Sequence, residues 1–340
     1  MRILVHEFVS GGGLAGKPVP PSLAREGRAM RDALVADLVA SGGHEVVVTT
    51  DSRFPLATRQ GAIQARLSTS APSALSRLID SADAVWLIAP ESDRCLEKLA
   101  RRVERRGKPL LGPSAAVIRA VTDKAILPRW LSRAKVSHPV TETCSTSAGC
   151  RKLARELGYP LVLKPARGAG CVGVCLVRSE RDLERGISSV RRAQARGPIV
   201  VQQYVRGLAA SVSLLADGRR AHGLTLNVQR VRPASEFTYH GGQTPLRHPL
   251  ERRAVAAARR TCEIFPGLRG YVGVDLVLTE SEVFVIEVNP RLTTAYLGVR
   301  AVADENVAVL ALKACAGRLP RMRFMQRRGV RFSADGGVAS

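Results

Sequence analysis

The sequence predicts an α/β fold in its first third and an α+β arrangement beyond it. In about the first 115 residues, short apolar runs alternate with helical stretches, a pattern typical of a parallel sheet with crossover helices. Further along, apolar runs follow one another with mostly turns between them, which indicates antiparallel sheets. A chain of 340 residues, of which 45% are hydrophobic and 24% charged, is long enough to form two or three packed domains.

Three apolar runs in the N-terminal part fit the buried strands of a parallel sheet. They cover residues 2–9, 45–49 and 83–89, and the segments 24–40 and 75–79 between them have helical character. We therefore expect a small α/β domain at this end of the chain.

The second part of the chain begins with Ser114, a helix N-cap signal, after which helical character continues to about residue 133. Beyond this segment, candidate strands follow at short intervals, and their spacing predicts antiparallel pairing. They cover residues 160–165, 173–177, 199–204, 210–215, 223–228, 271–278 and 283–288.

The formal net charge of +23 raises the question of a nucleic-acid partner. Only eight of the 52 basic residues are lysine, and the arginines are scattered along the chain instead of being gathered in one tail. Aromatic residues, on which bases could stack, make up only 4% of the chain. The composition therefore does not favour nucleic acid, although a positive field would attract an anionic nucleotide or a carboxylate.

Targeting and redox signals point to the cytoplasm. No N-terminal stretch has the charge pattern and cleavage site of a signal peptide, and no apolar run approaches the ~20 residues that a membrane span requires. The seven cysteines contain no C-x-x-C pair, so neither a disulfide framework nor a zinc site is expected. We expect a cytoplasmic protein without a membrane partner, and the sequence is compatible with either a monomer or a homodimer.

Two apolar strands near the C-terminus carry polar side chains that fit a metal site. If the strands form a hairpin, Asp275 lies opposite Glu287, and Asn289 lies two positions further on the same face. Carboxylate and amide oxygens are ligands that Mg²⁺ prefers, and a cation would offset the cost of burying two carboxylates together. The alternative is that both carboxylates are exposed or paired with arginines.

A second motif joins a lysine to a glycine-rich turn over residues 161–174. Lys164 stands at the end of an apolar strand, and Gly168, Gly170 and Gly173 follow before the next strand. Glycines let backbone N–H groups approach an anion closely, and the lysine adds a positive charge. These features suit the phosphates of a nucleotide, and a plain β-hairpin is the alternative.

Together the two motifs resemble the ATP-grasp superfamily over most of residues 112–300. This resemblance implies an ATP-grasp fold with an N-terminal Rossmann-like α/β domain, a small lid subdomain and a C-terminal antiparallel-sheet subdomain. The expected division is residues 1–115 for the N-terminal domain, 116–198 for the lid, 199–325 for the C-terminal subdomain with the metal site, and 326–340 for a tail.

The resemblance also implies roles for residues at matching positions. Lys124 and Lys164 would contact the phosphates of ATP, and Arg291 would bind the transferring phosphate with its planar guanidinium. The other implied contacts are Gly168, Gly170, Gly173, Gln202, Gln203 and Val205 with ATP, and Asp275, Glu287 and Asn289 with Mg²⁺ or alternatively Mn²⁺. The chain departs from many members at Gln202, where they have a glutamate, and near Ala209, where they have a second glutamate for the ribose.

A finer resemblance connects the chain with the tyramine–glutamate ligase group of methanofuran biosynthesis. It rests on residues 6–13, 226–229 and 237–245. It implies ATP-dependent ligation of L-glutamate to tyramine, so that an amino acid and an amine would be the small-molecule substrates. The candidate substrate contacts are Glu7, Asn227, Gln229, Tyr239, Gly241 and Gly242. The last five could instead be ordinary turn or edge residues.

Residues 11–18 nearly match the phosphate loop G-x-x-x-x-G-K-[ST]. The match fails at Pro18, which has neither a hydroxyl to bind Mg²⁺ nor a backbone N–H to face a phosphate. We expect this loop to shape the substrate side of a cleft instead. Two rival functions remain, an ATP-grasp dipeptide or D-alanine-type ligase, and a nucleotide- or nucleic-acid-binding protein without catalysis.

Overall fold

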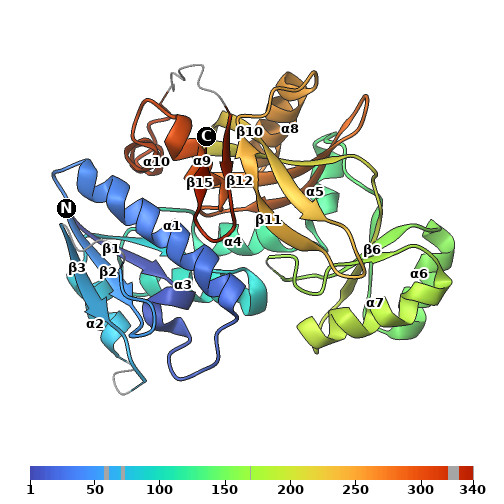
Figure 1. Cartoon of the computed structure of the whole chain (residues 1–340), viewed down its shortest axis with the longest axis horizontal. Coiled ribbons are helices and arrows are strands. Elements are labelled where there is room, and N and C mark those ends of the chain that lie inside the picture. The colour runs from blue at the N-terminus through green and yellow to red at the C-terminus, as the bar shows by residue number, and fades with distance from the viewer. Residues whose placement is uncertain (57–60, 70–72, 169, 321–328, 340) are drawn as a thin grey trace.

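The computed structural model describes residues 1–56, 61–69, 73–168, 170–320 and 329–339. Residues 326–328 and 340 of the expected tail, and Ala169 of the glycine-rich turn, lie outside these ranges. The described residues form three sheets, which Figure 1 shows as a blue N-terminal part, a central yellow-to-red part and a green part at the opposite end. The combination of α/β and α+β architecture predicted from the sequence is confirmed.

A four-stranded parallel sheet with the order β3-β2-β1-β4 forms the N-terminal part. Its strands are β1 (Arg2–Glu7), β2 (Glu45–Thr50), β3 (Ala62–Arg66) and β4 (Ala84–Ile88), accompanied by the turn η1 (Val9–Gly13), helices α1 (Pro21–Ala40) and α2 (Ala74–Ser81), the turn η2 (Ser92–Arg94) and helix α3 (Cys95–Glu104). Strand β3 is absent from the expected strands because it is a half-exposed edge strand, so its sequence lacks a continuous apolar run.

The helical segment expected over residues 114–133 is interrupted. Helix α4 (Ala115–Thr122) begins after Ser114, whose side chain accepts a hydrogen bond from the first turn, and helix α5 (Leu127–Arg133) follows after a break. At the break, Asp123 adopts an extended conformation with ψ of 100°. This interruption takes Lys124 out of the helical path and lets its side chain reach the cavity described below.

The small green sheet in Figure 1 is antiparallel and has the order β5-β8-β6-β7. It consists of β5 (Thr141–Cys144), β6 (Leu161–Pro165), β7 (Cys175–Val177) and β8 (Ile199–Gln203), with helices α6 (Ser147–Leu157) and α7 (Glu180–Ala193). In this sheet a turn joins β6 to β7 as expected, whereas the full helix α7 lies between β7 and β8, and α6 precedes β6. Helix α7 buries Leu183, Ile187 and Val190, which recur at helical spacing among charged residues.

The largest sheet has seven strands in the order β13-β12-β9-β10-β11-β14-β15. These are β9 (Leu208–Asp217), β10 (Ala221–Arg232), β11 (Thr238–Thr244), β12 (Arg269–Leu278), β13 (Val283–Asn289), β14 (Val330–Phe332) and β15 (Val338–Ala339), with helices α8 (Glu251–Glu263), α9 (Ala295–Val302) and α10 (Val307–Cys315). Every pairing in this sheet is antiparallel, as predicted for this part of the chain. None of the helices in the described ranges is long and apolar enough to cross a membrane.

Helix α1 packs between the parallel sheet and the largest sheet, in one shared hydrophobic core. Leu34 of α1, Tyr271 of β12 and Leu310 of α10 belong to this core. Asp37 of α1 also accepts hydrogen bonds from Arg300 of α9. Because these contacts fix α1 against the largest sheet, side chains from the N-terminal half of α1 can face the same cavity as side chains of β12 and β13.

Candidate active site

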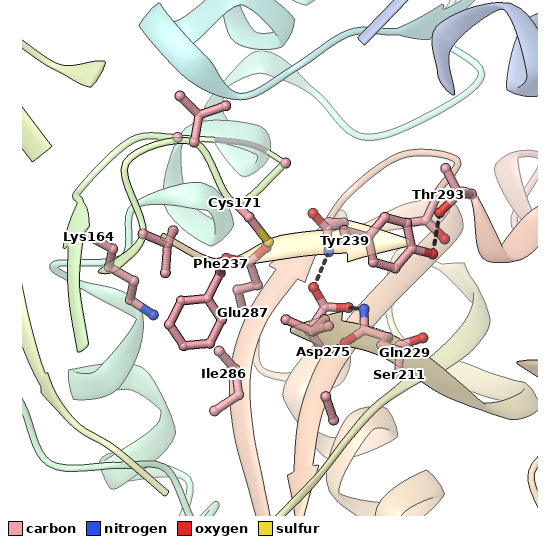
Figure 2. Close-up of a pocket in the computed structure, with 18 of the residues that line it drawn as sticks. Lys164, Cys171, Ser211, Gln229, Phe237, Tyr239, Asp275, Ile286, Glu287 and Thr293 are labelled. Atoms are coloured by element: carbon pink, nitrogen blue, oxygen red, sulfur yellow. Dashed lines mark hydrogen bonds between the residues drawn. The ribbon is translucent and has the colours of Figure 1, made fainter. Parts of the chain in front are cut away.

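A cavity of about 280 Å³ lies where the three sheets meet. Strands β6 and β8 of the small sheet, strands β9 to β13 of the largest sheet, and helix α1 with the end of β4 contribute lining residues. In Figure 2, the acidic side chains of β12 and β13 extend into this space, and Lys164 of β6 faces it from the side. All three predicted metal ligands and both predicted lysines are among the lining residues.

The acidic side chains lie on a hairpin with the register predicted from the sequence. Asp275 of β12 pairs directly with Glu287 of β13, and Gly273 pairs with Asn289. Asn289 Nδ2 donates a hydrogen bond to Asp275 Oδ2 at 3.2 Å, and Gln229 Nε2 of β10 donates to Asp275 Oδ1 at 2.9 Å. The second of these bonds is a dashed line in Figure 2. Two carboxylates and an amide thus converge on one patch.

The electrostatics of this patch favour a cation. Burial and the neighbouring Glu287 carboxylate both raise the pKa of Asp275. Burial would also raise the pKa of Glu287, but Lys124 and Lys164 outweigh it, so the net effect is a lowered pKa. Lys124 Nζ lies 3.0 Å from Glu287 Oε2 and donates to the Gly168 carbonyl at 2.8 Å. The two adjacent carboxylates and the Asn289 amide form a donor set that fits Mg²⁺ in its oxygen chemistry.

Lys164 stands at the other side of the cavity and is almost fully buried, with 4% of its surface exposed. Its ammonium donates to Gln202 Oε1 at 3.0 Å, and Gln202 Nε2 donates in turn to Thr141 at 2.7 Å. Burial lowers the pKa of Lys164 to about 8. A poorly solvated ammonium of this kind would gain strongly from an approaching phosphate.

The predicted nucleotide contacts divide into two groups. Gly168, Gly170, Gln202, Gln203 and Val205 all line the cavity. Gly173 does not, because it packs against α7. A Cβ at this position would lie 2.5 Å from Ala193 Cβ, and the backbone has φ of +71°, which a glycine adopts without strain. A packing role therefore replaces the predicted nucleotide contact at Gly173.

Arg291 follows β13 and lines the cavity, but it also binds a residue that the sequence reasoning missed. Its Nε and Nη2 donate to both carboxylate oxygens of Glu91 at 2.7 and 2.9 Å. Glu91 follows strand β4 of the parallel sheet, so this bidentate pair connects that sheet with the end of the β12–β13 hairpin. The position of Glu91 just beyond the carboxyl end of a parallel strand, where ligands of such sheets bind, was the available signal.

Comparisons with known proteins agree with this geometry. Residues 121–295 match the family model of the ATP-grasp domain, and residues 44–118 match that of the pre ATP-grasp 3 domain. The chain belongs to the ATP-grasp family. Its members include ATP-dependent ligases, and the fold predicted from the two motifs is thereby confirmed.

Three similar proteins illustrate the range of the family. The carbamoyl phosphate synthase large chain of Rubrobacter xylanophilus is 29% identical over 230 residues, which are 65% of this chain and only 21% of that protein. The chain therefore spans about a fifth of the length of this curated relative. The crystal structure of an ATP-grasp superfamily protein from Archaeoglobus fulgidus has a TM-score of 0.72 and 26% identity, covering 97% of this chain and 92% of that one.

A third structure contains a nucleotide. The biotin carboxylase domain of the Hydrogenobacter thermophilus 2-oxoglutarate carboxylase, in complex with MgADP and bicarbonate, has a TM-score of 0.73. At 18% identity over 95% of this chain and 72% of that one, the likeness concerns the fold.

Two of the residues predicted to contact substrate line the cavity of this ATP-grasp chain with polar side chains that already have partners. Gln229 donates a hydrogen bond to Asp275, and the Tyr239 hydroxyl lies 2.6 Å from Thr294 Oγ1. Glu7 also lines the cavity, but its carboxylate oxygens accept hydrogen bonds from the backbone N–H groups of Val9 and Ser10. Glu7 therefore anchors the turn that follows β1, and its predicted contact with a substrate amine stays a prediction.

Three further substrate predictions lie outside the cavity lining. Asn227 is fully buried in the sheet, where its Nδ2 donates to Ser211 and Ser213. A Cβ at Gly241 would lie 2.1 Å from the Phe332 carbonyl oxygen, and one at Gly242 would lie equally close to that of Val228. These residues hold β10, β11 and β14 together at close range, so packing replaces the predicted substrate contact.

The loop that resembles a phosphate loop does not hold its lysine over the cavity. None of residues 11–18 lines the cavity, and Lys17 is exposed. Gly11 packs so closely against β2 that a Cβ would lie 2.4 Å from Thr49 Oγ1. Val9, which precedes the loop, is the residue of this segment that borders the cavity.

Proposed function

We propose that this protein is an ATP- and Mg²⁺-dependent ligase that joins a carboxylate to an amine through an acyl phosphate. One observation carries the proposal. Two adjacent carboxylates, an amide, two buried lysines and an arginine from four separate segments line a single cavity. Such a set of groups matches the charges of a metal-bound triphosphate and has no comparable use in a passive binding module.

In this proposal Asp275, Glu287 and Asn289 would hold Mg²⁺, which would offset negative charge on the phosphates. Lys124 and Lys164, which both line the cavity near Glu287, would bind phosphate oxygens. Arg291 presents its guanidinium to the transferring phosphoryl group while Glu91 holds it in position. Gln202, Gln203 and Val205 lie at the end of β8, where they can bind the base.

The reaction has two steps. A carboxylate oxygen of the first substrate bonds to the γ-phosphorus as the bond to ADP breaks, which gives an acyl phosphate. The amine gives up its ammonium proton to water, its neutral nitrogen then bonds to the acyl carbon as inorganic phosphate leaves, and the nitrogen loses a second proton to form the amide. The glycine-rich turn after β6 borders the cavity and is suited to exclude water, which would otherwise hydrolyse the acyl phosphate.

For the substrates we propose L-glutamate and tyramine, as in methanofuran biosynthesis. The support is the resemblance over residues 6–13, 226–229 and 237–245, together with Gln229 and Tyr239 as polar groups of the cavity. An ATP-grasp dipeptide or D-alanine-type ligase is the second candidate. We further propose the division into residues 1–115, 116–198, 199–325 and a tail over 326–340.

The test is ADP release measured with combinations of amino acids and amines, with hydroxylamine to trap the acyl phosphate. We expect release to require a carboxylate substrate, and the hydroxamate to identify it. Asp275→Asn and Glu287→Gln should each lower turnover with Mg²⁺ at least about 100-fold. Glu282→Gln, an exposed carboxylate in the turn of the same hairpin, is the control and should keep full activity. Full turnover of either cavity variant would overturn the metal assignment, and ADP release independent of any carboxylate would overturn the ligase assignment.

A further inference from the structure

One face of helix α1 borders the cavity. Leu23, Glu26, Gly27 and Met30 line it, and their spacing of three, four and seven residues defines a single helical stripe. The stripe presents one carboxylate between two apolar side chains. No part of the nucleotide or metal site described above uses it.

Gly27 explains how this helix approaches the cavity floor so closely. A Cβ at Gly27 would lie 2.7 Å from Glu7 Cδ, so only glycine leaves room for the Glu7 side chain. Glu7 is in turn committed to the backbone of Val9 and Ser10. The Glu7 carboxylate of β1 therefore packs against α1 at Gly27. Glu26, the residue before Gly27 on α1, lines the cavity.

Four carboxylates line the cavity, and three of them have partners. Glu7 binds backbone amides, Asp275 accepts from Gln229 and Asn289, and Glu287 pairs with Lys124. The fourth, Glu26, makes no hydrogen bond or ion pair with any part of the chain that the structure describes.

The surroundings of Glu26 favour a cationic ligand. Burial raises its pKa, and the nearby charges of Arg291 and Arg25 oppose this effect without contacting it. Arg291 is already held by Glu91 through both oxygens of that residue. A half-buried carboxylate has lost part of its hydration, and a bound cation would offset that loss.

The side chains next to Glu26 on the helical stripe are apolar. Leu23 and Met30 precede and follow it on α1 and line the same cavity. The charge of Arg291 and the hydroxyl of Tyr239 also lie within electrostatic reach of Glu26. A ligand whose positive group meets Glu26 can therefore rest an apolar body on Leu23 and Met30.

We propose that Glu26 binds the ammonium group of the amine substrate, and that Leu23 and Met30, its apolar neighbours on the same helical stripe, select amines with an apolar or aromatic body. This inference rests on the proposed ligase function, because it assigns one of that reaction's two substrates to a place in the cavity. It also places the amine on the side of Arg291, near the phosphoryl group whose acyl product the amine attacks.

The test compares wild type, Glu26→Gln and the control Glu142→Gln, an exposed carboxylate on the edge strand β5. The probe amines are tyramine, phenethylamine and n-hexylamine, with L-glutamate and ATP as co-substrates. We expect Glu26→Gln to raise KM for the amines roughly 10- to 100-fold, the usual worth of a charged hydrogen bond, with kcat within a few-fold of wild type. KM for ATP and L-glutamate and the yield of hydroxamate with hydroxylamine should stay unchanged, since hydroxylamine needs no ammonium site. Leu23→Ala should weaken n-hexylamine roughly tenfold and leave hydroxylamine trapping unaffected.

An unchanged KM for all three amines, or an increase that falls on L-glutamate instead, would overturn the assignment of Glu26 while leaving the ligase function intact. If wild type releases no ADP with any substrate pair, the ligase function itself fails. Calorimetric titration of phenethylamine then still decides the site, because it does not require turnover. Binding to wild type that weakens at least tenfold in Glu26→Gln supports the site, and equal or absent binding in both overturns it.

Discussion

The ion pair between Glu91 and Arg291 should contribute strongly to the free energy that holds the parallel sheet against the β12–β13 hairpin. Glu91 and Arg291 expose only 4% and 13% of their side chains, and two hydrogen bonds of 2.7 and 2.9 Å join them. At an effective dielectric constant of ~20, unit charges ~4 Å apart attract by about 4 kcal/mol. Removing one partner of such a pair costs about 3–5 kcal/mol, because the other charge stays buried.

Glu91→Gln keeps an oxygen for Arg291 and loses only the charge, so we expect the free energy of unfolding to fall by about 2 kcal/mol. With an unfolding entropy of about 0.7 kcal/mol per kelvin for 340 residues, Tm should fall by roughly 3 °C. Calorimetry and urea unfolding measure both quantities. The matched control is Glu184→Gln, which removes the same charge from a pair with Arg151 in which both partners are 43% or more exposed.

The control should change the free energy of unfolding by less than about 0.5 kcal/mol, because an exposed pair is screened by solvent. Equal shifts in the two variants would refute the reasoning, since burial would then make no difference. A Glu91→Gln variant as stable as wild type would refute it as well.

Two further predictions concern the floor of the cavity and its buried lysine. Gly27→Ala should destabilise the fold by about 1–3 kcal/mol, because its Cβ would overlap the Glu7 carboxylate. Helix propensity alone predicts a gain of ~1 kcal/mol, so a stabilised variant in urea unfolding would contradict the packing argument. Burial lowers the pKa of Lys164 from 10.5 to about 8, so the unfolded chain holds more protons between these pH values and this group's contribution to stability rises across that window. Near pH 9 Lys164 is mostly neutral, and the phosphates of ATP should favour its charged form, so ATP binding should be accompanied by proton uptake. Calorimetry in buffers of different ionisation enthalpy measures this uptake. Lys164→Met should abolish that uptake, and uptake of the same size in the variant would exclude Lys164 as its source.

The sequence predicted some elements of the fold and of the site correctly and missed others. Alternating apolar runs gave the parallel sheet, and the hairpin spacing gave the pairing of Asp275 with Glu287, because both depend on the two-residue period of a strand. The edge strand β3 and helices α6 and α7 were not predicted from the sequence. Their apolar residues are few and spread among charged ones, so pattern alone identified them poorly.

The errors at the substrate side have a common cause. Asn227, Gly241 and Gly242 belong to a distinctive stretch of sequence, but their surroundings come from β9 and β14, which lie elsewhere in the chain. The sequence alone does not distinguish a polar or small residue that faces a ligand from one that faces a neighbouring strand.

The sequence by itself determined the alternation of strands and helices, the two motifs for phosphate and metal, and the membership in a family that these motifs indicate. Only the tertiary structure decided that Glu7 binds the backbone of its own turn, that Glu91 holds Arg291, and that Glu26 faces the cavity without a hydrogen-bond partner among the residues that the structure describes. The physical reason is that a side chain's role depends on what fills the space around it. That space is bounded by segments that meet only when the three sheets pack together.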